Sequence, residues 1–236
     1  KEGRAIYDNI RKFIRYLLSC NLGEILTMLM AILAGLPLPL LPIQILWVNL
    51  VTDGLPAIAL GVDPPDEDVM LRRPRHPRES VLAGLAAKIT GQSAYIAAAT
   101  IASFWLALYL GENDLRLART ISFSTLVMVQ LFYVFDCCSE RQSIFEKGLF
   151  SNPWLVVAVI VSLAMHWAVL YVPLLQAVFK TVSLNSWHWA LVLFISGFRT
   201  LGAALSCVVR TVTKTDFLPG AKGSRRQPTS SPYRFS

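Results

Sequence analysis

Long apolar stretches separated by short charged connections dominate this chain. Residues 89–111, 120–135 and 153–179 contain no charged side chain, and Glu24 is the only charged residue within 16–40. A helix needs about 20 mostly apolar residues to cross a hydrocarbon core of roughly 30 Å. The apolar positions are continuous and do not alternate, which favours helices over a membrane β-barrel. Six membrane-spanning helices are therefore predicted, at about 13–35, 40–61, 86–110, 119–138, 153–172 and 188–208.

This pattern predicts an all-α fold, a polytopic transmembrane helix bundle. The charged amphipathic stretch 1–12 is interpreted as the end of a cytoplasmic stalk, helical from its start. The six-helix transmembrane domain then occupies 13–208. The last segment, 209–236, is basic and rich in Pro, Ser and Gly, which is typical of a disordered cytoplasmic tail.

The composition agrees with a membrane protein. Of the 236 residues, 54% are hydrophobic and 16% charged, and the mean hydropathy is +0.51. A soluble domain carries about 25% charged residues. These values exclude a disordered chain, a collagen-like repeat and a typical soluble enzyme.

The net charge of +7 is explained by topology. With the N-terminus in the cytoplasm, 18 of the 22 Lys and Arg residues fall in cytoplasmic segments. Positively charged connections stay on the cytoplasmic side. Both termini are therefore expected in the cytoplasm, the lipid bilayer is the expected partner, and no nucleic acid is needed to explain the charge. The plasma membrane is the expected host.

Two carboxylates inside the first two predicted spans are the main candidates for function. Glu24 lies about 13 residues before the turn between these spans, and Asp53 about 15 residues after it. At 1.5 Å per residue, both lie roughly 20–23 Å from the turn and at a similar depth. Ionisable residues at such a depth are costly and by default mark an ion or substrate pathway.

The neighbours of the two carboxylates are also oxygen donors. Asn21 precedes Glu24 by three residues, and Asn49 and Thr52 precede Asp53 by four and one. Oxygen ligands suit Ca²⁺, Mg²⁺ or an alkali ion, and seven oxygens at most are available here, within the 6–8 that Ca²⁺ takes. Pro56 lacks a backbone donor, so a disturbed turn with freed carbonyls is predicted before it. The alternative is that these side chains form interhelical hydrogen bonds only.

The residues KEGRAIYDNI at 1–10, SCNLGE at 19–24 and LWVNLVTDGLPA at 46–57 resemble P-type cation pumps, above all the calcium ATPases. The resemblance covers about 1–208 and implies the C-terminal transmembrane region, helices five to ten. It implies that Asn21, Glu24, Asn49, Thr52 and Asp53 ligate a transported Ca²⁺. It also implies an ATP-driven cycle through an aspartyl phosphate, with Mg²⁺ and ATP bound outside this chain.

Several parts of that family are not found in these residues: the phosphorylated Asp motif, the nucleotide-binding and actuator domains, and helices one to four. The chain is therefore expected to need this missing N-terminal part of the same pump as its partner and to be inactive alone. The loop Asp63–Ser80 is expected to dock against the phosphorylation domain through its acidic start and basic end, or else to be a solvated loop.

Gln130, in the fourth span, departs from the calcium pumps with two ion sites, which tend to have Glu there. Gln resembles the sodium–potassium pumps at this position, and it indicates a single Ca²⁺ per cycle, with Gln130 as a further candidate ligand. Asn49 instead resembles the calcium pumps. Two other functions remain open: a P-type pump for a monovalent cation such as Na⁺, and a stand-alone six-helix channel or membrane subunit without ATPase activity.

Overall fold

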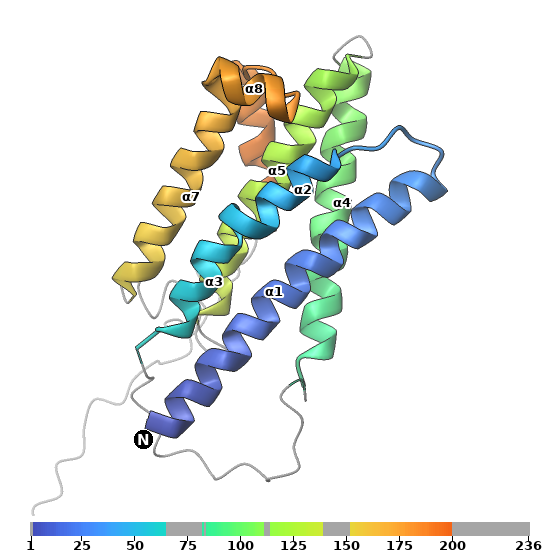
Figure 1. Ribbon diagram of the computed structural model, residues 1–236. Coiled ribbons are helices and arrows are strands. Elements are labelled where there is room, and N and C mark those ends of the chain that lie inside the picture. The colour runs from blue at the N-terminus through green and yellow to red at the C-terminus, as the bar shows by residue number, and fades with distance from the viewer. Residues whose placement is uncertain (1, 65–81, 83, 111–113, 139–151, 200–236) are drawn as a thin grey trace, which may run out of the picture.

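The computed structural model describes residues 2–64, 82, 84–110, 114–138 and 152–199. Every regular element in these ranges is a helix, which confirms the predicted all-α fold class. The elements, shown in Figure 1, are α1 (Glu2–Leu33), α2 (Pro42–Trp47), the π-helix η1 (Val48–Thr52), α3 (Gly54–Gly61), α4 (Ala86–Leu110), α5 (Leu115–Cys137), α7 (Pro153–Tyr171), α8 (Pro173–Phe179) and a last helical segment at 186–199.

Within the described residues, five helices are long and apolar enough to cross a membrane: α1, the interrupted helix Pro42–Gly61 made of α2, η1 and α3, then α4, α5 and α7. The sixth predicted span, 188–208, is helical over 188–199, and its remaining positions, 200–208, lie outside the described residues. The predicted tail, 209–236, and all but the first two residues of the loop 63–80 also lie outside them.

The helix α1 runs from Glu2, in agreement with a stalk that is helical from its start, and it continues without a break into the first span. One helix, α5, starts earlier than the apolar pattern predicts. The helix α5 begins at Leu115 because the Asp114 side chain accepts hydrogen bonds from the backbone N–H groups of Arg116 and Leu117. Such an N-cap stabilises the first turn of a helix even where that turn is charged. The apolar pattern alone therefore predicts the start of this helix too late in the sequence.

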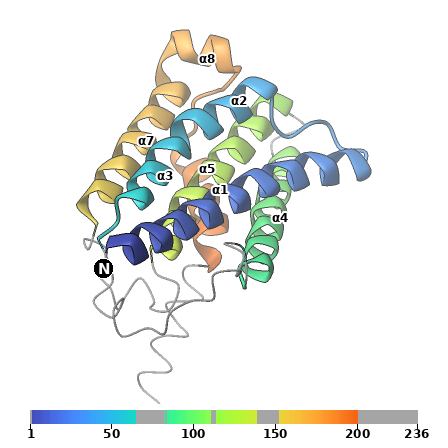
Figure 2. The same ribbon diagram turned by 60° about the horizontal axis from the view of Figure 1, so that its bottom comes forward.

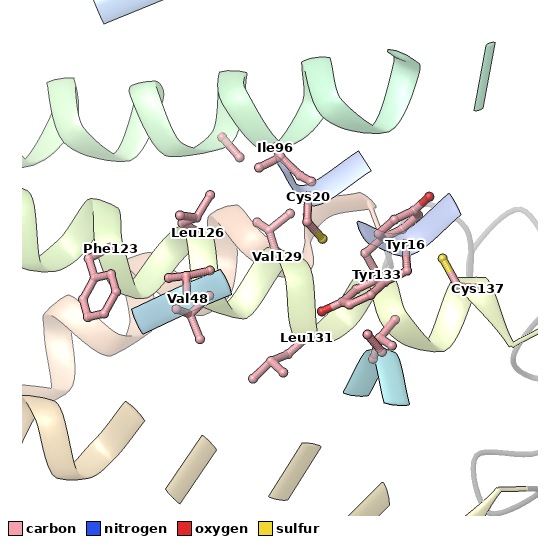
Figure 3. Close-up of a cluster of buried hydrophobic side chains, with 14 of the residues drawn as sticks. Tyr16, Cys20, Val48, Ile96, Phe123, Leu126, Val129, Leu131, Tyr133 and Cys137 are labelled. Atoms are coloured by element: carbon pink, nitrogen blue, oxygen red, sulfur yellow. The ribbon is translucent and has the colours of Figure 1, made fainter. Parts of the chain in front are cut away.

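The helix α5 is the centre of the bundle. In the most apolar run of 18 residues of α5, 83% is buried inside the bundle, against 28% in the corresponding run of α7. Figure 3 shows Phe123, Leu126, Val129 and Tyr133 of α5 within the main apolar cluster. In both ribbon views α5 lies among the other helices, with α7 at the outside (Figures 1 and 2). Side chains on all faces of α5 therefore meet other helices.

The helices α1 and α4 approach each other closely at Gly23. A Cβ atom added at Gly23 would lie 2.8 Å from Cγ2 and 2.9 Å from Cβ of Ile96 in α4. Small residues allow this kind of contact between membrane helices, where packing rather than the hydrophobic effect holds helices together. The contact fixes the position of α1 one residue before Glu24.

Candidate functional site

The helix Pro42–Gly61 is irregular where the sequence places three candidate ligands. Residues Val48–Thr52 form a π-helical turn, in which the Asp53 N–H donates to the Val48 carbonyl at 2.8 Å. Pro56 has no N–H and leaves the Thr52 carbonyl without its usual helical donor. The disturbed turn predicted before Pro56 is thus present. Single π-helical turns of this kind are frequent at functional sites.

Glu24 joins three helices through its two carboxylate oxygens. Asn49 of η1 donates its side-chain amide to Oε2 at 2.7 Å, and Gln130 of α5 donates to Oε1 at 3.0 Å. Glu24 is buried, with 3% of its surface exposed. The structure therefore brings together three of the residues singled out from the sequence, contributed by α1, η1 and α5.

Asp53 is fully buried and has a different partner. The Tyr16 hydroxyl of α1 donates to Asp53 Oδ1 at 2.9 Å. Tyr16 lies two helical turns before Glu24, so Asp53 meets α1 at a different level from Asn49. Both carboxylates thus lie at the contact between α1 and the interrupted helix. Each accepts hydrogen bonds from neutral donors, and no donor is shared between them.

Tyr16 was not predicted from the sequence. Its ring stacks on Tyr133 of α5, with ring centroids 6.1 Å apart, as Figure 3 shows. The Tyr133 hydroxyl in turn lies 3.0 Å from Ser19 Oγ and accepts a hydrogen bond from Arg15 Nε at 3.2 Å. One feature of the sequence could have indicated this role. Tyr16 stands at the start of an apolar stretch, and a buried tyrosine usually has a polar partner for its hydroxyl.

Three buried polar oxygens of the candidate site have no hydrogen-bond partner among the residues that the structure describes. They are Thr52 Oγ1, Asp53 Oδ2 and Gln130 Oε1. Unpaired buried oxygens are unfavourable and few in folded proteins, so each calls for an explanation. A hard cation is the kind of ligand that such oxygens bind.

The remaining candidate ligand, Asn21, is half-buried in α1 and precedes Glu24 by three residues. The irregular turn itself is supported from α7, where Ser162 Oγ lies 3.4 Å from both the Val51 and Thr52 carbonyls. In the described parts of the chain there is no group of three or more His, Cys, Asp or Glu side chains that suits a metal. The candidate site therefore combines two carboxylates with amide, hydroxyl and carbonyl oxygens.

A membrane helix bundle with two buried carboxylates beside an interrupted helix has features typical of proteins that bind ions within the membrane. The sequence profile of the family described as "Cation transporting ATPase, C-terminus" matches residues 37–206. This chain belongs to that family of P-type cation-transporting ATPases, and it comprises its C-terminal membrane region.

Curated relatives agree on this family. The chain is 52% identical over 211 residues to a calcium-transporting ATPase of Bacillus subtilis, covering 89% of this chain and 24% of the relative. It is 37% identical over 227 residues to the endoplasmic reticulum calcium ATPase srcA of Aspergillus fumigatus, covering 83% and 23%. It is 40% identical over 211 residues to calcium-transporting ATPase 1 of Bacillus cereus, covering 83% and 24%. The chain thus spans about a quarter of the length of the relatives it matches.

Proposed function

We propose that this chain is the ion-binding membrane part of an ATP-driven P-type pump that moves Ca²⁺ out of the cytoplasm. The observation that carries this proposal is a buried pair of carboxylates at a π-helical turn: Glu24 accepts from Asn49 of the turn, Asp53 directly follows it, and unpaired oxygens lie in the same site. The relatives are calcium-transporting ATPases by name, which supports Ca²⁺ as the transported ion.

In this proposal Glu24 and Asp53 balance the two charges of one Ca²⁺. The oxygens of Asn21, Asn49 and Thr52 complete most of the 6–8 ligands that Ca²⁺ takes. Gln130 donates its amide N–H to Glu24 in this structure, so its unpaired Oε1 is available only if the amide turns toward the ion. Because Gln130 carries no charge, the site suits one divalent cation per cycle rather than two.

The energy for transport would come from outside this chain. The remaining, N-terminal part of the same pump would supply the missing helices and the domains that bind Mg²⁺ and ATP, and the chain alone would not hydrolyse ATP. The charge distribution supports a multi-pass protein with both termini in the cytoplasm. The plasma membrane is proposed as its host membrane.

The substitution Asp53→Asn in the full-length pump tests this function. It removes one negative charge and keeps the volume and the acceptor for Tyr16, so Ca²⁺-dependent phosphorylation of the pump by ATP is expected to be lost. The matched control is Asp114→Asn, the same chemical change at an exposed N-cap, where Asn caps about as well as Asp.

Two results would contradict the proposal. Phosphorylation of Asp53→Asn that keeps its Ca²⁺ dependence would remove Asp53 from the ion site. Phosphorylation of the unaltered pump that requires Na⁺ and ignores Ca²⁺ would identify a monovalent pump, and no phosphorylation with any cation would favour a channel or membrane subunit.

A further inference from the structure

A third buried acid, Asp63, lies two residues beyond the end of α3. Three of its oxygens each accept a hydrogen bond from a different side chain. Lys12 Nζ lies 2.5 Å from Oδ2, Asn152 Nδ2 lies 2.9 Å from Oδ1, and Asn9 Nδ2 lies 2.8 Å from the backbone oxygen. The side chains of Lys12 and Asp63 are 4% and 0% exposed. The sequence predicts that the loop beginning at Asp63 docks on another domain or is solvated. The Asp63 carboxylate itself is buried among the helices and takes part in neither.

Asn9, Lys12, Asp63 and Asn152 together form what we call the three-helix joint. Asn9 and Lys12 belong to α1, and Asn152 is the N-cap of α7, accepting from the Leu155 N–H at 3.1 Å. Figures 1 and 2 both show the start of α1, the end of α3 and the start of α7 at the same end of the bundle. The joint therefore fastens these three helix ends to one another.

The joint is also linked to the candidate ion site. The helix α3 fills the interval between Asp53 and Asp63 and is about 12 Å long at 1.5 Å per residue. At one end Asp53 accepts from Tyr16, and at the other Asp63 pairs with Lys12, one helical turn earlier on α1. The helix α3 is thus held to α1 at both ends, and a shift of its far end moves Asp53.

We propose that the three-helix joint positions α3 against α1, so that Asp53 and Thr52 keep the geometry that binds the transported ion. Lys12 and Asp63 are positioning residues that act through α3 and do not contact the ion. The inference rests on the proposed function, because ion binding is the property that the joint adjusts.

The charge of the pair explains how the position is specified. A buried ammonium or carboxylate that loses its partner is strongly unfavourable, so α3 cannot slide along α1 without leaving both charges unpaired. An amide pair in the same place would keep hydrogen bonds at a smaller penalty for slipping. Exchanging the two charges is excluded, because a lysine at 63 would face the donating amide of Asn152.

The test uses the full-length pump and measures phosphorylation by ATP as a function of Ca²⁺ concentration. Asp63→Asn leaves the Lys12 ammonium beside an amide. It is expected to raise the half-maximal Ca²⁺ concentration about tenfold, a change of 1.4 kcal/mol in apparent affinity. The maximal level of phosphorylation should be kept, because saturating Ca²⁺ draws α3 back into the binding arrangement.

Two further variants make the test specific. The double variant Lys12→Gln with Asp63→Asn leaves no charge unpaired and restores a neutral hydrogen-bonded pair. Its half-maximal Ca²⁺ should lie between that of Asp63→Asn and that of the unaltered pump, because an amide pair opposes slipping less than an ion pair does. Asn9→Ala keeps the ion pair and should give a smaller increase in the same direction. Thr90→Val is the control, since its hydroxyl bonds only within α4, at an exposed position.

An unchanged half-maximal Ca²⁺ in both Asp63→Asn and Asn9→Ala would overturn the inference. A double variant as weak as Asp63→Asn would overturn it as well, because pairing would then not be the cause. If Asp63→Asn does not fold, Asn9→Ala and the double variant decide by the same measurement. A pump that shows no Ca²⁺ dependence before any substitution refutes the proposed function instead, and that result is read from the unaltered protein alone.

Discussion

Asp53 and Asp63 lie at the two ends of α3 and are nearly equally buried, with 0% and 3% of their surfaces exposed. Their surroundings differ. Asp63 has a cation on one oxygen and an amide donor on the other. Asp53 has one neutral hydroxyl donor, and its second oxygen is unpaired among the described residues.

The comparison shows that burial alone does not separate a structural acid from a functional one. A saturated carboxylate such as Asp63 has its ligands already and fixes the position of helices. A carboxylate with spare acceptor capacity, such as Asp53, is suited to bind something that comes and goes. Glu24 is intermediate: each of its oxygens accepts a hydrogen bond, as in Asp63, but both donors are neutral amides and neither is a cation.

The largest expected difference between the two ends of α3 is in stability. Lys12→Met should destabilise the protein by about 3–5 kcal/mol, because it leaves the Asp63 carboxylate buried without its cation. Asp53→Asn should change the free energy of unfolding by about 1 kcal/mol or less, because the amide oxygen still accepts from Tyr16. Denaturant unfolding of the purified full-length protein without Ca²⁺ measures both. Equal losses for the two variants would remove the distinction between the acids.

A smaller effect is expected next to Glu24. Gly23→Ala places a Cβ atom against the branched Cβ of Ile96 and should destabilise the protein by about 1–3 kcal/mol, as overpacking does. Gly91→Ala in α4 is the control: its added Cβ meets nothing within 4 Å, and the better helix propensity of Ala should stabilise by up to about 1 kcal/mol. The same unfolding measurement applies, and Gly23→Ala behaving like Gly91→Ala would show that α1 and α4 are not closely packed at Glu24.

The smallest effect is expected at the π-helical turn. Ser162→Ala removes a hydroxyl that lies 3.4 Å from each of two carbonyls, a long contact for a hydrogen bond. The free energy of unfolding should fall by less than about 1 kcal/mol, and the half-maximal Ca²⁺ should stay within about threefold. A rise comparable with that of Asp63→Asn would mean that α7, more than the three-helix joint, holds the turn in place.

Much of the fold was predictable because membrane helices reveal themselves as uncharged stretches. Glu24 and Asp53 were found for the same reason, as rare charges in such stretches, and the contact between Asn49 and Glu24 agrees with the predicted antiparallel pairing of their helices. The structure shows how these side chains are placed, but the ligand roles of all six candidates stay predictions: Asn21, Glu24, Asn49, Thr52, Asp53 and Gln130.

The partners of the two aspartates were not predictable from local patterns. Tyr16 and Asp53 are 37 residues apart, and Lys12 and Asp63 are 51 apart. Asp63 stands before two prolines and further acids, where solvent exposure is the ordinary expectation, and Lys12 is one of several basic residues in a charged stretch. Only the packing of α1, α3 and α7 brings these residues together.

The π-helical turn also affects how the interrupted helix Pro42–Gly61 is aligned with the corresponding helix of a relative. Each residue advances a regular α-helix by about 100°, so the extra residue accommodated within Val48–Thr52 shifts by one the sequence positions that face a given direction after it. Asn49 and Asp53 consequently reach different levels of α1 from one short stretch. Because the wide turn takes up one extra residue, deleting one residue between them would give a regular helix with α3 in nearly its present orientation, but without the turn that presents Asn49 and Asp53 separately. A segment exchanged between relatives must therefore keep the residue count between Val48 and Asp53.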